Sequence, residues 1–213
     1  MDKYKIRIAK MHELSNILAL INGNLCASID LRAKDLYEFA LSQEMVHVVE
    51  AANGSLTGVS IIFLYGESLP FAEIGSTIMT GPKGHPFYEV VIASQVLHFY
   101  LISRFGRKLI ANINSSNRST ARRLRLNLGF RDFIPPVSVL DENTTQIGKS
   151  PEDVKWYYCP ISALAKHAEI IYNQHLSPQS KNKKGQQIEI YVDSLPILSS
   201  SDCLNAILGL INT

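Results

Sequence analysis

The first forty residues change from a strand pattern to a helical pattern. From Tyr4 to Ala9 charged and apolar residues alternate, which is typical of a half-buried strand. Apolar residues then recur at spacings of three and four from Glu13 to Ile21 and from Leu31 to Leu41. We therefore expect one strand followed by two amphipathic helices. The buried face of the second helix is expected to carry Leu36, Phe39 and Ala40.

Three strand-like runs follow, over Met45 to Ala51, Leu56 to Tyr65 and Phe71 to Thr80. The first two runs are joined by Asn53-Gly54, a dipeptide that favours a tight hairpin turn. Since each run is short and separated from the next by only a few residues, the pattern predicts three antiparallel strands.

A loop rich in glycine and proline, residues 81–86, separates these strands from the next elements. The pattern then predicts a long helix from Phe87 to Phe105 and a strand from Leu109 to Asn114. A short helix follows, which Asn117 can cap and Gly129 can end in the left-handed conformation. The apolar face of this short helix carries Ala121, Leu124 and Leu128.

The main part of the chain ends with two more strands. Phe130 to Ile134 reads as a strand that Pro135-Pro136 stops, and a loop up to Pro151 leads to a last strand from Val154 to Cys159. The predicted order is therefore strand, two helices, three antiparallel strands, helix, strand, helix, strand.

Residues 161–213 form a C-terminal extension to a main domain of residues 1–160. The extension is predicted to contain a helix, a polar linker, a short strand and a final apolar helix, over Ile161–His175, Ser177–Gln187, Ile188–Val192 and Asp202–Ile211. The lysines of the linker suit a solvated segment or a contact patch. The last helix can pack on the main domain or on a second copy, so a homodimer through the extension is one expectation.

Composition favours a folded protein without a membrane span. Hydrophobic residues make up 46% and charged residues 19% of the 213 residues, which is enough apolar material for a core. The formal charge of +2 excludes no class of partner, and no apolar run approaches a membrane span or a signal peptide. The three cysteines are widely separated and lack metal-type spacing. We expect a reduced, cytoplasmic protein.

The segment from Asn117 to Phe130 resembles the second acyl-CoA motif of the GNAT superfamily of N-acetyltransferases. Asn117 is followed after three residues by Ala121 and after two more by Leu124, and the segment ends in Leu-Gly-Phe at residues 128–130, as in the family motif. The predicted element order over about residues 3 to 160 is also the GNAT order. The resemblance implies a GNAT-like α/β fold, with a mixed, mostly antiparallel central sheet flanked by helices, and here a C-terminal helical extension.

The resemblance also implies a catalytic residue. Phe71-Ala72-Glu73-Ile74 resembles the fourth-strand segment of the histone-acetyltransferase branch, in which the glutamate is the general base. Glu73 matches it, and removal of a proton from an attacking amine is the task such a base performs. Burial in a cleft would raise the pKa of its carboxyl group, whereas strand alternation equally allows Glu73 to face water.

The co-substrate that the resemblance implies is acetyl-CoA or another acyl-CoA. A backbone amide near Met79 would polarise the thioester, and Asn117 would bond to the pantetheine arm. The residues expected to contact the donor are Ile78, Met79, Thr80, Lys83, Gly84, Asn117, Arg118 and Arg122.

The expected phosphate-binding loop departs from the family pattern. Two positions that are small in the family are Phe87 and Glu89 here. Gly81 and Gly84 with Lys83 and His85 can form a shifted phosphate cradle, or the same residues can be a plain structural turn.

A second departure concerns the group that reprotonates the leaving thiolate. Many members of the family have a tyrosine directly after the leucine that matches Leu124. This chain has Arg125 there, and arginine cannot give up a proton near neutral pH. Tyr88, Tyr157 or solvent can replace it.

Three hypotheses for function remain open. The first is transfer of an acyl group, with acetyl the first choice, from acyl-CoA to a small-molecule or peptide amine by direct attack. The second is a non-catalytic GNAT-like binding protein. The third keeps catalysis but takes the acyl group from an acyl carrier protein. The acidic carrier would meet the arginine-rich segment, which carries Arg118, Arg122, Arg123, Arg125 and Arg131. Nucleic acid is disfavoured, because no aromatic residues alternate with the arginines.

Overall fold

The computed structural model describes residues 1–24, 31–66, 69–101, 107–147 and 154–193. Within these ranges nine strands form one sheet in the order β6-β7-β5-β4-β3-β2-β1-β9-β8. Neighbouring strands are antiparallel except for β4 beside β5 and β1 beside β9, which are parallel. The expected mixed, mostly antiparallel sheet is therefore confirmed. The strands are β1 (Asp2–Ile8), β2 (Val46–Ala51), β3 (Leu56–Leu64), β4 (Phe71–Met79), β5 (Lys108–Asn114), β6 (Arg131–Phe133), β7 (Val154–Tyr158), β8 (Gln179–Lys181) and β9 (Gln187–Val192).

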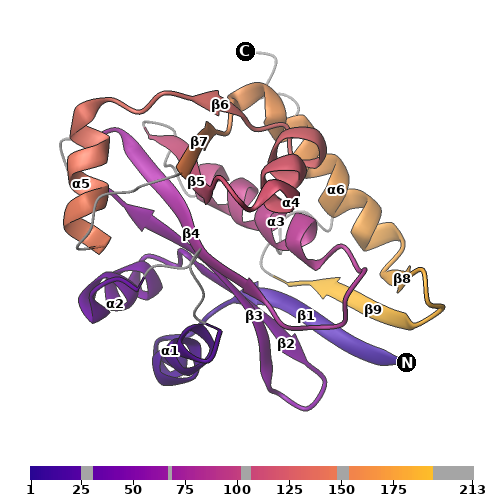
Figure 1. Cartoon of the computed structure of the whole chain (residues 1–213). Helices are drawn as coiled ribbons and strands as arrows, with labels where there is room; N and C mark the ends of the chain where they lie inside the picture. Colours follow the sequence, from indigo (N-terminus) through magenta and orange to yellow (C-terminus); the bar gives the residue numbers. More distant parts are fainter. Residues whose placement is uncertain (25–30, 67–68, 102–106, 148–153, 194–213) are drawn as a thin grey trace.

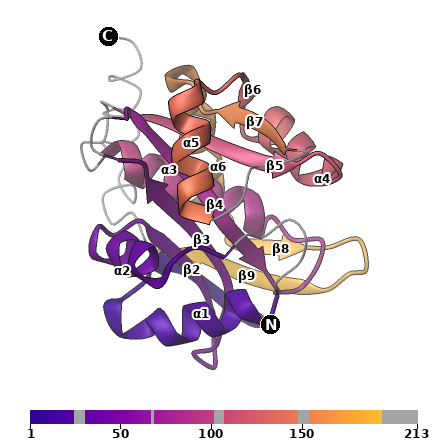
Figure 2. The same cartoon turned by 60° about the vertical axis from the view of Figure 1, so that its left-hand side comes forward.

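Helices cover both faces of this sheet (Figure 1). On one face α1 and α2 pack against β3, and on the other α3 contacts β2 and β3 while α6 packs along α3. Figure 2 shows α5 above α1 and α2. None of the described helices is long and apolar enough to cross a membrane. The helices are α1 (Leu14–Asn22), α2 (Lys34–Ser42), α3 (Phe87–Leu101), α4 (Arg118–Arg122), α5 (Val137–Ile147) and α6 (Leu164–Leu176).

Helix α3 is the centre of the core. Every residue from Val90 to Tyr100 is buried, because the sheet and α6 enclose the helix from two sides. Its buried Gln95 is fully engaged: Oε1 accepts a hydrogen bond from Ser60 Oγ at 2.7 Å, and Nε2 donates to the carbonyl oxygens of Met45 and Ser60. These hydrogen bonds connect α3 to Ser60 of β3, the residue opposite the irregular part of β4.

The buried face of α2 differs from the sequence prediction. Tyr37, Ala40 and Leu41 are buried, whereas Phe39 is 49% exposed and Leu36 only partly buried. The face that meets β3 is centred on Tyr37 and Leu41, one turn apart and one position later than expected. Tyr37 packs edge-on against Phe63 of β3, with ring centroids 5.5 Å apart. The prediction for Phe39 was therefore wrong.

Residues 137–147 form helix α5, where the sequence had suggested a loop. Its buried positions are Val139, Asn143 and Gln146, at the helical spacings of four and three. Two of these three residues are polar, so the hydrophobic pattern that normally reveals a helix is missing. Val139 packs in an apolar cluster with Phe71 and Trp156, whereas Asn143 and Gln146 meet polar groups.

The C-terminal extension joins the central sheet. Strand β9 pairs with β1 in parallel, and β8, which lies inside the expected polar linker, pairs with β9. The predicted helix Asp202–Ile211 lies outside the described residues. The extension thus lengthens the sheet beyond β1, and α6 packs on α3 as a second layer.

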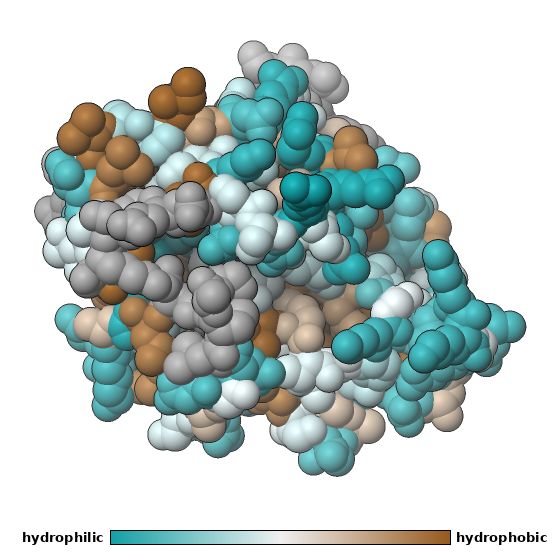
Figure 3. Space-filling model, in the orientation of Figure 1, coloured by the Kyte–Doolittle hydropathy of each residue, from teal (hydrophilic) through white to brown (hydrophobic). Residues whose placement is uncertain are grey.

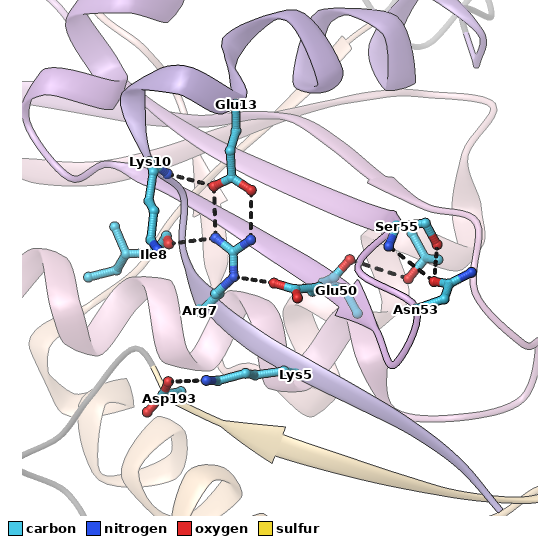
Figure 4. Close-up of polar contacts among 11 residues, drawn as sticks. Lys5, Arg7, Ile8, Lys10, Glu13, Glu50, Asn53, Ser55 and Asp193 are labelled. Carbon is cyan, nitrogen blue, oxygen red and sulfur yellow. Dashed lines mark hydrogen bonds and ion pairs between the residues drawn. The ribbon is translucent and has the colours of Figure 1, made fainter.

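A half-buried arginine ties β1 to the start of α1 and to β2 (Figure 4). Both terminal nitrogens of Arg7 donate to the Glu13 carboxylate, at 2.8 and 2.6 Å, and its Nε donates to Glu50 at 2.5 Å. The two-pronged contact with Arg7 lowers the pKa of Glu13 to about 2. Lys5 of the same strand pairs with Asp193, which directly follows β9.

Gly129 is required by both its conformation and its surroundings. Its φ is +74°, and an added Cβ would lie 3.1 Å from Cβ of Ala163 at the start of the extension. We expect Gly129→Ala to lower the free energy of unfolding by about 2 to 3 kcal/mol, through left-handed strain and crowding. Gly54→Ala is the control, because Gly54 has a φ of +81° and open space around it, and strain alone costs about 1 kcal/mol. Urea unfolding compares the two variants, and equal losses would contradict the crowding argument.

Candidate functional site

Strands β4 and β5 diverge and open a cavity between them. They pair only from Phe71 to Ile74, opposite Lys108 to Ala111; beyond this point β4 continues along β3 and β5 along β7. The cavity has a volume of about 210 Å³. Its walls come mainly from β4, β5, the start of α4 and one side of α5, and include Arg32, Glu73, Gly75, Ser76, Thr77, Met79, Tyr88, Asn112, Asn117, Arg123 and Asn143.

A bulge in β4 lies on the cavity wall. Ile61 of β3 faces Gly75 and Val59 faces Ile78, so Ser60 alone is opposite both Ser76 and Thr77. Ser76 has a φ of +46°, in the left-handed region. Thr77 Oγ1 donates to Ser60 Oγ at 2.9 Å, because the Ser60 hydroxyl hydrogen is used on Gln95. The bulge takes peptide groups out of the regular ladder at the point where the two strands separate.

Glu73 is buried at the inner end of the cavity, where only 2% of the residue is exposed. Its Oε1 accepts hydrogen bonds from Arg32 Nη2 at 2.7 Å and from Asn112 Nδ2 at 3.2 Å. Its Oε2 accepts from Asn143 Nδ2 at 2.8 Å and from the Tyr65 hydroxyl. A carboxylate has about four lone-pair positions, so all of them are engaged. Glu73 faces the cavity rather than bulk water, but it can take a proton from a ligand only if one donor withdraws.

Arg32, directly before α2, is the cationic partner of Glu73. Its side chain is 4% exposed, its guanidinium carbon lies 4.0 Å from the centre of the Phe63 ring, and it also donates to Gln146 of α5. Arg32 is not among the site residues predicted from the sequence. It lies 41 positions before Glu73, and no local motif marks it.

Two of the residues expected to contact a donor, Met79 and Asn117, lie on the cavity wall. Asn117 also caps α4, since its Oδ1 accepts from the backbone nitrogen of Thr120 at 3.2 Å. Ile78 is buried in the core, and the Thr80 hydroxyl donates to the carbonyl oxygen of Thr57. The structure therefore brings Met79 and Asn117 together across the cavity and places Ile78 and Thr80 outside its lining.

Arg118 and Arg122 lie in a different groove. Together with Arg125 and Lys155 they line a depression of about 690 Å³ on another side of α4. Figure 3 shows hydrophilic side chains gathered over α4. Arg125 pairs with Asp132 at 3.7 Å on the surface, whereas Arg123, on the cavity wall, pairs with Glu89 at 3.6 Å. Arg123 therefore lines the cavity, whereas Arg118, Arg122 and Arg125 line the groove on the other side of α4.

The loop with Lys83 and Gly84 contacts the C-terminal strands. Asn182 Nδ2 donates to the Lys83 carbonyl oxygen at 3.0 Å, and a Cβ at Gly84, whose φ is +86°, would lie 3.1 Å from Asn182 Cβ. His85 Nδ1 and Ser180 Oγ share a hydrogen bond of 2.9 Å. Neither Lys83 nor Gly84 lines the cavity, so these contacts favour the structural turn over the phosphate cradle.

The two large residues at the start of α3 have defined partners. The Phe87 ring lies against Gly81 and packs edge-on against Tyr4, with centroids 5.0 Å apart. The Glu89 carboxylate accepts from Asn127 Nδ2 at 3.1 Å in addition to its pair with Arg123. The first turn of α3, which favours an anion, therefore already holds one from the chain itself.

Tyr88 is the tyrosine that the cavity contains. Burial and the neighbouring Glu89 raise the pKa of its phenol above the ordinary range, so the hydroxyl stays protonated and can donate a hydrogen bond, but it is a weaker acid than an ordinary tyrosine. Tyr157, the other expected substitute for the missing tyrosine, is buried beside the second groove. Among the described residues no group of histidine, cysteine, aspartate and glutamate has the geometry of a metal site.

Comparison of the sequence with protein-family models and with curated proteins gave no match. Comparison of structures gave clear matches. N-acetylglutamate synthase from Neisseria gonorrhoeae, complexed with coenzyme A and N-acetyl-glutamate, has a TM-score of 0.54 at 17% identity, over 73% of this chain and 34% of that one. This chain thus spans about a third of the synthase chain.

Two further structures are matched over almost their whole length. A chain of the NatC complex bound to Gag peptide and CoA has a TM-score of 0.53 at 14% identity, over 74% of this chain and 98% of that chain. Rv2747 from Mycobacterium tuberculosis, in complex with CoA and NLQ, has a TM-score of 0.51 at 13% identity, over 72% and 96%. With the diverging β4 and β5 and the bulge at Ser76, these matches show that the chain has the fold of the GNAT N-acetyltransferases.

Proposed function

We propose that the protein is an acyl-CoA-dependent N-acyltransferase, with acetyl-CoA as the first donor to test. The observation that supports this most is the cavity between β4 and β5, which runs from Asn117 and Tyr88 to the buried Glu73 and passes the bulge of β4. Three structural neighbours, N-acetylglutamate synthase, NatC and Rv2747, were solved with coenzyme A. The proposed acceptor is a small-molecule or peptide amine.

The proposed reaction is direct attack of the amine on the thioester. The thioester carbonyl is polarised by a backbone amide of the bulged stretch that ends at Met79. The amine nitrogen forms the new C–N bond, the C–S bond breaks, and the thiolate leaves. Arg32 and Asn112 both donate to Glu73 Oε1, so the amine passes its proton to this oxygen once one of these two donors gives way to it. The thiolate takes up a proton from solvent, because the raised pKa of Tyr88 holds the phenol proton in place.

Two alternatives have specific support. The saturated Glu73 and the Glu89–Arg123 pair favour a protein that binds a ligand in the cavity without catalysis. The groove with Arg118, Arg122 and Lys155 favours an acidic acyl carrier protein as the donor, anchored by protein contacts. Competition between CoA and carrier protein for the acyl-transfer reaction separates these donors.

Calorimetric titration with acetyl-CoA and free CoA tests the proposal. Wild-type protein should bind with micromolar affinity, and Asn117→Ala should weaken binding roughly tenfold, equivalent to about 1.4 kcal/mol. Asn117→Ser is the matched control for the helix, because serine keeps a cap on α4 while removing the amide. Absence of binding to both compounds would refute the acyl-CoA proposal.

The same titration gives an opposite prediction for Glu89. Glu89→Gln removes a negative charge from the first turn of α3 and frees Arg123 for a diphosphate. We expect acetyl-CoA to bind about five to tenfold more tightly to this variant than to wild type. Glu142→Gln removes a carboxylate from α5 instead and should leave the affinity unchanged. Weaker binding to Glu89→Gln would mean that the donor does not approach this turn.

A further inference from the structure

The inner end of the cavity holds a cation of the chain itself, the guanidinium of Arg32. The Arg32 guanidinium is held by the Glu73 carboxylate at 2.7 Å, by the face of Phe63 at 4.0 Å and by the side-chain carbonyl of Gln146. A carboxylate, an aromatic face and a neutral acceptor are three groups that recognise guanidinium or ammonium ions. Each comes from a different element: β4, β3 and α5.

A second observation indicates that this end offers more acceptors than Arg32 uses. Asn143 is fully buried on the cavity wall, and its Oδ1 has no hydrogen-bond partner among the described residues. Rotating the amide would place Oδ1 against the Glu73 carboxylate, to which Nδ2 now donates, so the orientation is fixed. A buried, unpaired carbonyl oxygen needs an N–H donor, and the ligand is the natural source of one.

We propose that this end of the cavity is the subsite for a cationic group of the acyl acceptor, a guanidinium or an ammonium ion, and that Arg32 occupies it while no acceptor is bound. The identity of the ligand as an acyl acceptor rests on the proposed function; the cation site itself does not. An acceptor with a guanidinium or ammonium group takes the place of Arg32 on Glu73, Phe63 and Gln146 and supplies an N–H to Asn143.

This arrangement also determines which acceptors are excluded. An anionic group would meet the Glu73 carboxylate and the unpaired Asn143 oxygen once Arg32 has left, and both repel it. An uncharged group would lose the ion pair that Arg32 now makes. The subsite therefore selects for positive charge rather than for size alone.

Arg32→Ala tests the receptor, with guanidinium chloride as the probe. About 20 mM guanidinium should raise the thermal midpoint of the variant by roughly 3 °C or more, in a saturable way, and should have no such effect on wild type. Urea, which has a similar planar shape without charge, and sodium chloride at equal ionic strength are the controls. No rise beyond these controls, or an equal rise in wild type, would overturn the proposal.

A measurement on wild-type protein decides the matter if Arg32→Ala does not fold. Agmatine, which carries both a guanidinium group and a primary amine, should expose the Arg32 side chain and speed its modification by phenylglyoxal roughly threefold, as read by peptide mass spectrometry. Arg7 is the internal control, because its partners Glu13 and Glu50 lie outside the cavity. An unchanged rate at Arg32 would refute its replacement by a cation.

Neither measurement uses an acyl donor. Failure of acetyl-CoA to bind in the calorimeter would therefore leave a positive result at Arg32 intact, as evidence for a cation-binding protein. Conversely, tight binding of acetyl-CoA with no effect at Arg32 would support the acyltransferase proposal and reject a cationic acceptor.

Discussion

The Glu73→Gln variant should lose about 3 to 5 kcal/mol of unfolding free energy, because it leaves the Arg32 guanidinium buried without a counter-charge. Only 4% of the Arg32 side chain is exposed, so water cannot replace the lost partner. The glutamine nitrogen would also face donors, since the residues around position 73 now donate to the carboxylate: Arg32, Asn112, Asn143 and Tyr65. Urea unfolding at neutral pH measures the loss.

The double variant Arg32→Met, Glu73→Gln is the control. It removes both charges of the pair and should be more stable than Glu73→Gln alone, although it removes more native contacts. A Glu73→Gln variant within about 1 kcal/mol of wild type would contradict the buried pair. Loss of activity in Glu73→Gln alone does not identify Glu73 as a base, because a destabilised site loses activity for other reasons; the pH dependence of kcat in the folded variant is the needed readout.

Glu73 could be placed on a central strand from the sequence, but neither the direction of its side chain nor its environment could be predicted. Glu73 lies in a strongly apolar run whose length and neighbours indicate a central strand, and the cavity forms where that strand separates from β5. Its partners Arg32 and Asn143 lie 41 and 70 positions away along the chain. No periodicity within a window of ten to twenty residues reports such contacts.

Helix α5 is another feature that sequence periodicity did not predict. Amphipathic helices are found in a sequence because their buried face is apolar, and α5 buries Asn143 and Gln146 against the polar network instead. The loop with Lys83 and Gly84 is a second example. Its glycines are evident in the sequence, but its partner β8 is not, since Ser180 of β8 bonds to His85 from 95 positions further along the chain. Buried polar networks and contacts between segments far apart in the sequence are therefore the features that only the structure shows.

Acid should destabilise the fold through two histidines that are buried without charge. His47 and His167 are both 0% exposed, and burial lowers the pKa of each to about 3, with the neighbouring His98 adding to the effect at His47. Between about pH 6.5 and pH 3 the unfolded chain binds a proton at each histidine and the folded chain does not. The unfolding free energy therefore falls as the pH falls through this window, by up to about 1.4 kcal/mol per pH unit for each histidine.

Glu13 also contributes to the unfolding free energy, because its pKa is lowered to about 2 in the folded protein. This contribution is lost only as the pH falls below about 4.5. Urea unfolding at pH 7, 6 and 5 therefore isolates the histidines. His47→Leu should reduce the slope of stability against pH in this range by up to about half, since one of the two most strongly shifted sites no longer binds a proton in the unfolded chain. His85 and His98, whose pKa values burial also lowers, contribute to the slope that remains. His12→Asn, at an exposed position in the same fold, is the matched control and should keep the full slope. An unchanged slope in His47→Leu would mean that His47 carries a proton in the folded protein. Its complete burial argues against this, and so do its ring nitrogens, which have no hydrogen-bond partner among the residues that the structure describes.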